Sequence, residues 1–154
     1  MKAPVFLHEQ EGFLGLVEQI AGALNIEAYL IEKDCWLMHC LWGLKQQGWK
    51  FELKGGTSLS KGHQLIHRFS EDIDIRFEPP SEHGVKFGKN HDKPAHQASR
   101  REFFDWLATE IKIPGLKSVA RDTDFDDAKY RNCGILLGYL SKVRTQSSVQ
   151  SFSY

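Results

Sequence analysis

Residues 51–77 read FELKGGTSLSKGHQLIHRFSEDIDIRF and contain three local patterns in succession. The sequence predicts a short strand at 51–54, then a glycine-rich turn that opens a short helix, and then a second strand that carries Asp72 and Asp74. Strand, turn, helix and strand follow one another without a linker. We therefore expect the rest of the chain to pack around this unit.

The glycine-rich turn has the composition of an anion site. Its residues are Gly55, Gly56, Thr57 and Ser58. Glycine has no Cβ, so the backbone can approach a phosphate closely, and the N-terminus of the following helix points free N–H groups at the anion. Lys61, near the first turn of that helix, and Lys54, just before the turn, are candidate phosphate contacts. The turn predicts half of a nucleotide site.

The predicted second strand supplies the other half. Successive side chains of a strand alternate between its two faces, so Asp72 and Asp74 share one face while Ile73 and Ile75 share the other. Two neighbouring carboxylates suit a hard divalent cation such as Mg²⁺. A structural alternative stays open, in which a glycine turn precedes an edge strand whose aspartates face solvent and bind nothing.

Two helices are predicted before this unit. Apolar residues recur at intervals of three and four between residues 9 and 24, which is typical of an amphipathic helix. A second such pattern covers residues 27–47 and stops at Gly48, a residue that favours a helix C-terminus. Within it, Glu32, Lys33 and Asp34 form a charged group that we interpret as solvated.

The length of 154 residues predicts one domain. We assign this domain to residues 1–140, with a helical part at 1–48 and a core at 51–140. The polar stretch 141–154 has no apolar periodicity, so we expect a disordered tail there.

The composition excludes some classes of protein. Lys plus Arg and Asp plus Glu number 20 each, so net charge indicates no nucleic-acid footprint, and any such binding has to be local. No apolar run reaches the ~18 residues of a membrane span, and charged residues come too early for a secretory signal. We expect a cytoplasmic protein with no membrane partner. The three cysteines are expected to be reduced.

The second half of the chain contains a predicted loop, helix and strand. Residues 81–98 are rich in His, Gly, Lys and Pro and predict a long loop. The pattern at 99–111 predicts a helix, and the apolar run at 134–140 predicts a buried strand. A locally basic stretch spans the loop and the start of the helix, and we interpret it as a possible clamp for phosphates or RNA. Its residues are Lys86, Lys89, Lys93, Arg100 and Arg101.

Three segments resemble one protein family. They are IEKDCW at 31–36, the run from Phe51 to Ile75, and YRNCGILL at 130–137. Together they resemble the AbiEii/AbiGii nucleotidyltransferases, toxins of abortive-infection and type IV toxin–antitoxin systems within the DNA polymerase β-like superfamily. The likeness covers most of residues 26–140. It implies an α+β fold: a polymerase β-like nucleotidyltransferase core with a small mixed sheet, on which the N-terminal helices pack.

The resemblance also implies an activity. In such an enzyme the glycine turn and Lys61 bind a nucleoside triphosphate, and Asp72 and Asp74 hold Mg²⁺, with a two-ion site possible. Asp72, Asp74 and Lys61 are then the expected catalytic residues. The nucleotide would pass to an acceptor such as tRNA or another RNA, and a cognate antitoxin would be a protein partner.

One departure from the family pattern bears on activity. Family members continue beyond the strand that resembles GILL into a further strand with a third carboxylate, so we expect this chain to be truncated at its C-terminus. A third metal ligand would then come from Glu52 or from the acidic cluster at 122–127, which lacks the glycine and the final glutamate of a calcium loop. The alternative function is a catalytically inactive nucleotidyltransferase-fold module that binds a nucleotide or a protein partner.

Overall fold

The computed structural model describes residues 5–53, 74–88 and 90–143, and the backbone of 149–152. Its elements in chain order are η1 (Leu7–Glu9), α1 (Phe13–Leu24), α2 (Ala28–Gln46), β1 (Phe51–Leu53), β2 (Ile75–Phe77), η3 (Ser81–His83), α4 (Pro94–Glu110), β3 (Ser118–Asp122), η4 (Thr123–Phe125), β4 (Gly134–Leu140) and β5 (Val149–Phe152). The prediction of an α+β fold with helices at the N-terminus is confirmed.

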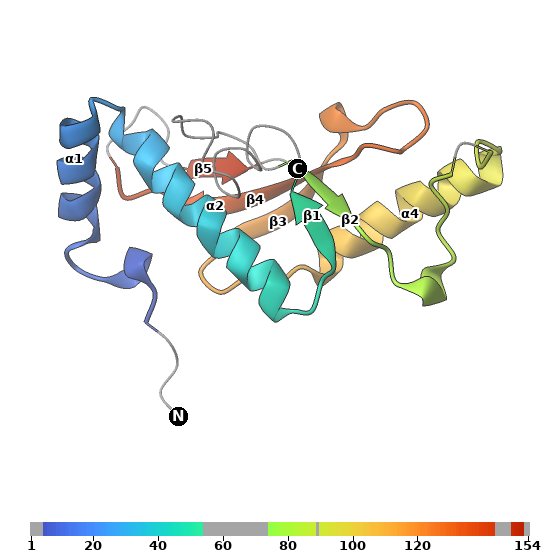
Figure 1. Cartoon of the computed structure of the whole chain (residues 1–154), viewed down its shortest axis with the longest axis horizontal. Coiled ribbons are helices and arrows are strands. Elements are labelled where there is room, and N and C mark those ends of the chain that lie inside the picture. The colour runs from blue at the N-terminus through green and yellow to red at the C-terminus, as the bar shows by residue number, and fades with distance from the viewer. Residues whose placement is uncertain (1–4, 54–73, 89, 144–148, 153–154) are drawn as a thin grey trace.

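The described strands form two antiparallel sheets. β1 pairs with β2, and β3, β4 and β5 form a second sheet in that order. Figure 1 shows α2 lying across the three-stranded sheet, with the β1–β2 pair beside the C-terminal half of α2. The division into two sheets was not predicted from the sequence.

Helix α2 is the centre of the main core. Leu37, Cys40 and Leu44 follow one another at intervals of three and four and are completely buried. They belong to one cluster with residues of α4, of β4 and of the segment between α4 and β3, namely Phe103, Leu107, Ile111, Ile113, Ile135, Leu137 and Tyr139. Burial of one apolar stripe per element is what holds such helices on a sheet.

Helix α1 forms a smaller second cluster on α2. Phe13 and Val17 of the predicted stripe are buried together with Ala21 and pack with Ile31 of α2, whereas Leu16 and Leu24 of that stripe are exposed. Asn25 ends α1 in the left-handed conformation, with φ of 53°, a conformation that asparagine tolerates better than most residues.

The N-terminal segment is tied to α2 by rings. His8 stacks on Trp36 at 4.0 Å between ring centroids, and Trp36 stacks on Tyr139 at 4.9 Å. The Lys142 ammonium group donates to the His8 carbonyl. This hydrogen bond joins the start of the chain to the segment that follows β4. The His8 side chain is only 5% exposed.

The prediction of a solvated charged group in α2 is wrong for Glu32. Its side chain is completely buried. Its carboxylate accepts hydrogen bonds from the Ser141 hydroxyl at 2.5 Å and from the Lys142 backbone N–H at 2.8 Å. The reason lies in the tertiary structure. The segment after β4 places the Ser141 hydroxyl and the Lys142 N–H against this face of α2. A buried polar group is tolerated where it is hydrogen-bonded.

Three other expectations differ from the structure. Helix α4 begins at Pro94, five residues before the predicted start at 99, because proline is suited to the first helical turn. Strand β3 at Ser118–Asp122 was not predicted, since its SVARD sequence carries only one large apolar residue. Within the expected tail 141–154, Val149–Phe152 pairs with β4, because backbone pairing at a sheet edge needs no apolar periodicity.

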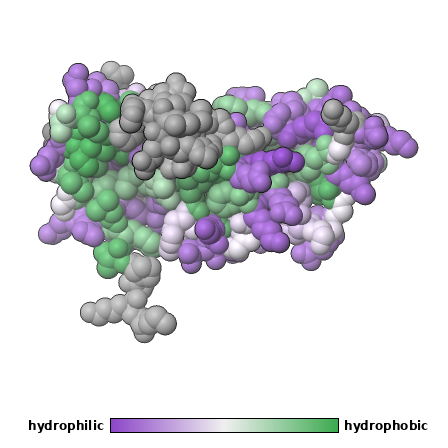
Figure 2. Space-filling view, viewed as in Figure 1, coloured by the Kyte–Doolittle hydropathy of each residue, from purple (hydrophilic) through white to green (hydrophobic). Residues whose placement is uncertain are grey.

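The surface and the cysteines complete the description. Figure 2 shows apolar residues gathered over the α1 and α2 side of this face and polar residues over the opposite side. All three cysteines are free, as predicted. Among the described residues, no single helix combines the length and apolar composition needed to cross a bilayer, although α1 and α2, bent by 117° at their junction, pass that test as a pair.

Candidate functional site

The β1–β2 pair marks where the predicted site begins and ends. Leu53 is the last residue of β1 and Ile75 the first of β2, and these two are partners in the sheet. The segment between them carries most of the predicted site. Lys54, Gly55, Gly56, Thr57, Ser58, Lys61 and Asp72 all lie outside the described residues. Of the predicted site residues, the structure describes Asp74.

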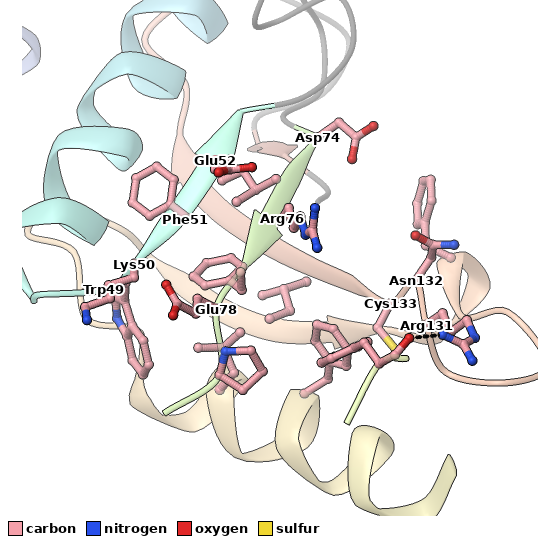
Figure 3. Close-up of a pocket in the computed structure, with 18 of the residues that line it drawn as sticks. Trp49, Lys50, Phe51, Glu52, Asp74, Arg76, Glu78, Arg131, Asn132 and Cys133 are labelled. Atoms are coloured by element: carbon pink, nitrogen blue, oxygen red, sulfur yellow. Dashed lines mark hydrogen bonds between the residues drawn. The ribbon is translucent and has the colours of Figure 1, made fainter. Parts of the chain in front are cut away.

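Asp74 shares a strand face with two other charged residues. Glu52 of β1 is the sheet partner of Arg76, which follows Asp74 by two positions. All three side chains are exposed, whereas Leu53, Ile75 and Phe77 pack against the main core. The alternation predicted from the sequence therefore holds for Asp74 and Ile75. Figure 3 shows Asp74 at the start of β2, Arg76 further along it and Glu52 on the neighbouring strand.

These three residues border a cavity of about 1290 Å³. Its described lining comes from the β1–β2 pair and residues next to it, from α4, and from the chain around the start of β4. We call the part that lies outside the β1–β2 pair and its neighbours the second wall; its residues are Phe87, Phe104, Leu107, Phe125, Arg131, Asn132, Cys133 and Ile135. Ligand sites are concave, mostly apolar and carry a few polar groups, and their volumes run from ~300 to ~1000 Å³. The cavity is therefore large enough for a nucleotide.

The polar part of the second wall is held by Asp92. Arg131 donates to one Asp92 carboxylate oxygen at 2.6 Å and Lys129 donates to the other at 3.2 Å. These bonds hold the pKa of the Asp92 carboxyl below its usual value. Arg131 also donates to the carbonyl groups of Phe87 and Gly88, so its position at the edge of the cavity is fixed.

Arg100 stabilises the same wall from within the protein interior. The prediction that Arg100 is part of a phosphate clamp is therefore wrong. The side chain is completely buried. It donates to the carbonyl groups of Lys86, His91 and Lys129 at 2.8 to 2.9 Å. Three of the five N–H donors of this guanidinium group are bonded to carbonyl groups, and Nη2, for which no hydrogen bond is found among the described residues, lies 3.9 Å from the Asp92 carboxylate. Arg100 is therefore a structural element of this wall.

Cys133 also lines the cavity. Burial, followed by the nearby charge of Asp126, raises the pKa of its thiol to about 12. The thiol is therefore neutral at physiological pH, and a neutral thiol is a poor nucleophile and a poor metal ligand.

The acidic cluster at 122–127 is engaged in local structure. The Asp122 carboxylate accepts from the backbone N–H of Asp124, and Asp126 forms a two-pronged pair with Arg121, the shorter contact being 2.6 Å. The described residues contain no group of three or more His, Cys, Asp or Glu side chains that could hold a metal. Glu52 and Asp74 are the exposed carboxylates on the shared face of the β1–β2 pair, next to the predicted metal position.

Some cavity residues were not predicted from the sequence. Arg76 had a detectable signal, since a residue two positions after Asp74 must share its face. Phe125 and Asn132 had none, because they join the β1–β2 residues in one cavity lining only through the tertiary fold.

An α+β domain with exposed carboxylates on two neighbouring short strands beside a nucleotide-sized cavity is consistent with a nucleotidyltransferase-like domain. Comparison with protein families gives a match over residues 37–149 to the family described as nucleotidyl transferase AbiEii toxin, type IV TA system. The chain belongs to the AbiEii family of nucleotidyltransferase toxins. A search of curated proteins and a search of solved structures each found no significant match.

Proposed function

We propose that the chain transfers a nucleotide from a nucleoside triphosphate to an RNA acceptor such as tRNA, with Asp72 and Asp74 as metal ligands. The observation that carries the proposal is the position of Asp74. It lies next to the first residue of β2, on the face shared with Glu52 and Arg76, and it borders a cavity of about 1290 Å³. The family description supports the same chemistry.

Glu52 is the third carboxylate of the proposal. On one face of an antiparallel pair, diagonal neighbours lie roughly 7–8 Å apart, a distance that long side chains can close. Glu52 and Asp74 are such diagonal neighbours, because the partner of Glu52 is Arg76. Both are exposed carboxylates, and oxygen ligands suit Mg²⁺. When bound, the metal would neutralise charge on the attacking and leaving oxygens.

The other proposed roles follow from the reaction. An acceptor hydroxyl forms a bond to the α-phosphorus, the bond to the pyrophosphate oxygen breaks, and the hydroxyl proton is released. The turn Gly55 to Ser58, with Lys61, would hold the β- and γ-phosphates through N–H and hydroxyl groups. Arg76 is an exposed cation within the cavity lining and would contact the remaining phosphate charge.

A protein partner also belongs to the proposal. The matched family is described as the toxin of a type IV toxin–antitoxin system, so we expect a cognate antitoxin. Co-expression of the chain with the product of a neighbouring reading frame, followed by co-purification, tests this part by itself.

The experiment that tests the activity is label transfer. The purified chain is incubated with each labelled nucleoside triphosphate, Mg²⁺ and total tRNA, and labelled RNA is measured. Asp74→Asn is expected to reduce transfer on the order of a hundredfold or more, because a metal ligand is lost. Glu52→Gln should also reduce it. Asp124→Asn is the matched control, since Asp124 is an exposed carboxylate outside the cavity lining.

The outcomes separate the candidate functions. Transfer that is unaffected by Asp72→Ala combined with Asp74→Ala contradicts the proposal. Mg²⁺-dependent nucleotide binding by the unaltered chain, without transfer to any RNA, instead identifies the inactive binding module. Absence of any nucleotide binding leaves a structural domain.

A further inference from the structure

The turn before β4 is built around the carboxylate of Asp127. That carboxylate accepts from the backbone N–H groups of Lys129, Arg131 and Asn132 at 2.9 to 3.2 Å, and from Nδ2 of the Asn132 side chain at 3.0 Å. Burial alone would raise the pKa of Asp127, but these hydrogen bonds hold it below its usual value. Asp127 is therefore an ionised carboxylate, which can only accept hydrogen bonds.

This fixes the orientation of the Asn132 amide. An acceptor-only carboxylate must face the NH₂ group of the amide, so the amide oxygen Oδ1 points the other way. Asn132 is exposed and lines the cavity. Figure 3 shows its oxygen on the side toward Arg76 and its nitrogen on the opposite side. Among the described residues no donor to Oδ1 is found, so the cavity contains a fixed, available acceptor.

Phe125 supplies an aromatic surface in the same wall. It is 51% exposed, high for a phenylalanine, and it lines the cavity. Its position depends on Gly134, because a Cβ atom added to Gly134 would lie 2.8 Å from the Phe125 Cβ. An exposed aromatic ring on which a base can stack, together with an oriented amide, is a combination that recognises nucleobases.

We propose that Phe125 and Asn132 bind the base of the donor nucleotide and select bases that carry an exocyclic amino group. This inference rests on the proposed function, since it concerns the base of the same nucleoside triphosphate whose phosphates lie near Asp74. The amino group of cytosine or adenine donates to Asn132 Oδ1. Uracil and hypoxanthine present an oxo oxygen at that position, and two acceptors face each other without a hydrogen.

Two pairs of nucleotides test this contact. CTP and UTP differ at C4, amino against oxo, and at the adjacent N3, acceptor against N–H; ATP and ITP differ in the same way at C6 and N1. With the unaltered chain and Mg²⁺, we expect the amino member of each pair to bind about tenfold more tightly, as one satisfied against one unsatisfied hydrogen bond implies. The measurement is the equilibrium Kd of each nucleotide, which does not require transfer to occur.

Three variants assign the effect to the residues. Asn132→Ala removes the acceptor and should bring the two members of each pair to within about twofold of each other. Asn132→Ser is a second variant in case the first unfolds, with folding checked by thermal melting. Phe125→Ala should weaken all four nucleotides alike, because stacking does not depend on the amino group. Asn90→Ala is the control, since Asn90 is exposed and outside the cavity lining.

The results distinguish this inference from the proposed function. Nucleotide binding without an amino preference, or with a preference that Asn132→Ala leaves intact, overturns the base assignment while the nucleotidyltransferase proposal stands. Failure of the unaltered chain to bind any of the four nucleotides overturns both.

Discussion

The buried carboxylate of Glu32 offers the sharpest test of how the fold is held together. It connects α2 to the chain that leaves β4, through the Ser141 hydroxyl at 2.5 Å and the Lys142 backbone N–H at 2.8 Å. Glu32→Ala removes both acceptor oxygens from a position that is completely buried. We expect this substitution to destabilise the domain although Glu32 lines no part of the cavity around Asp74.

The size of the effect follows from the contacts. The Ser141 hydroxyl has a second acceptor in the Val143 carbonyl at 3.3 Å, so it loses little. The Lys142 N–H loses its partner, which costs about 1–3 kcal/mol for a buried donor. The buried Cγ methylene group of Glu32, which is lost with the carboxylate, adds about 0.8 kcal/mol. Together the free energy of unfolding should fall by about 2–4 kcal/mol.

Urea denaturation followed by tryptophan fluorescence measures this change. Glu32→Gln should lose only about 1 kcal/mol, because its amide oxygen can accept from Lys142 while its NH₂ donates to the Ser141 hydroxyl. Glu18→Ala on the exposed face of α1 is the control and should stay within about 0.5 kcal/mol. A Glu32→Ala variant as stable as this control would refute the reasoning.

Three further predictions concern packing, polar contacts and pH. Gly43→Ala should destabilise the domain by about 1–3 kcal/mol, because its Cβ would lie 2.7 Å from the Ile113 side chain, whereas Gly22→Ala in open space should stabilise it by about 0.5–1 kcal/mol; thermal melting separates the two. Arg100→Met should cost about 2–5 kcal/mol in urea denaturation, because three carbonyl groups lose a buried donor; a value near zero would contradict that account. Burial and then the charge of His39 lower the pKa of His8 to about 4, so the unfolded chain binds a proton first as pH falls. About 2–3 kcal/mol of the free energy of unfolding that is present above pH 6.5 should therefore be lost between pH 6.5 and 4. His8→Phe should flatten that part of the pH profile of stability.

Local patterns predicted the parts of the fold that depend on local periodicity. The apolar stripe of α2 and the apolar run of β4 each bury most of a face, so their residue types alone identify them. Strand β3 was not predicted because its own sequence, SVARD, has no strong preference for the extended conformation. It forms a strand because it pairs with β4. Glu32 escaped because its donors at Ser141 and Lys142 are far away in the sequence.

The residues of the candidate site also fall into those that local patterns predict and those that depend on contacts between elements. Asp74 and Arg76 share a face because alternation along a strand is a local rule, and the structure confirms it. The amide of Asn132 is oriented by Asp127 through a turn only a few residues long, yet its presence in the cavity depends on how β4 packs. Local rules therefore predict which side chains are grouped on one element, whereas contacts between elements decide which groups face each other.

Because Leu53 pairs with Ile75, the end of β1 and the start of β2 lie side by side. A short connection can therefore join them, since a two-residue turn such as Asn-Gly closes antiparallel strands. Replacement of residues 54–74 by that dipeptide would yield a chain that retains both strands and lacks the whole candidate phosphate turn. These two strand ends are thus the positions at which the corresponding segment of another family member could be grafted.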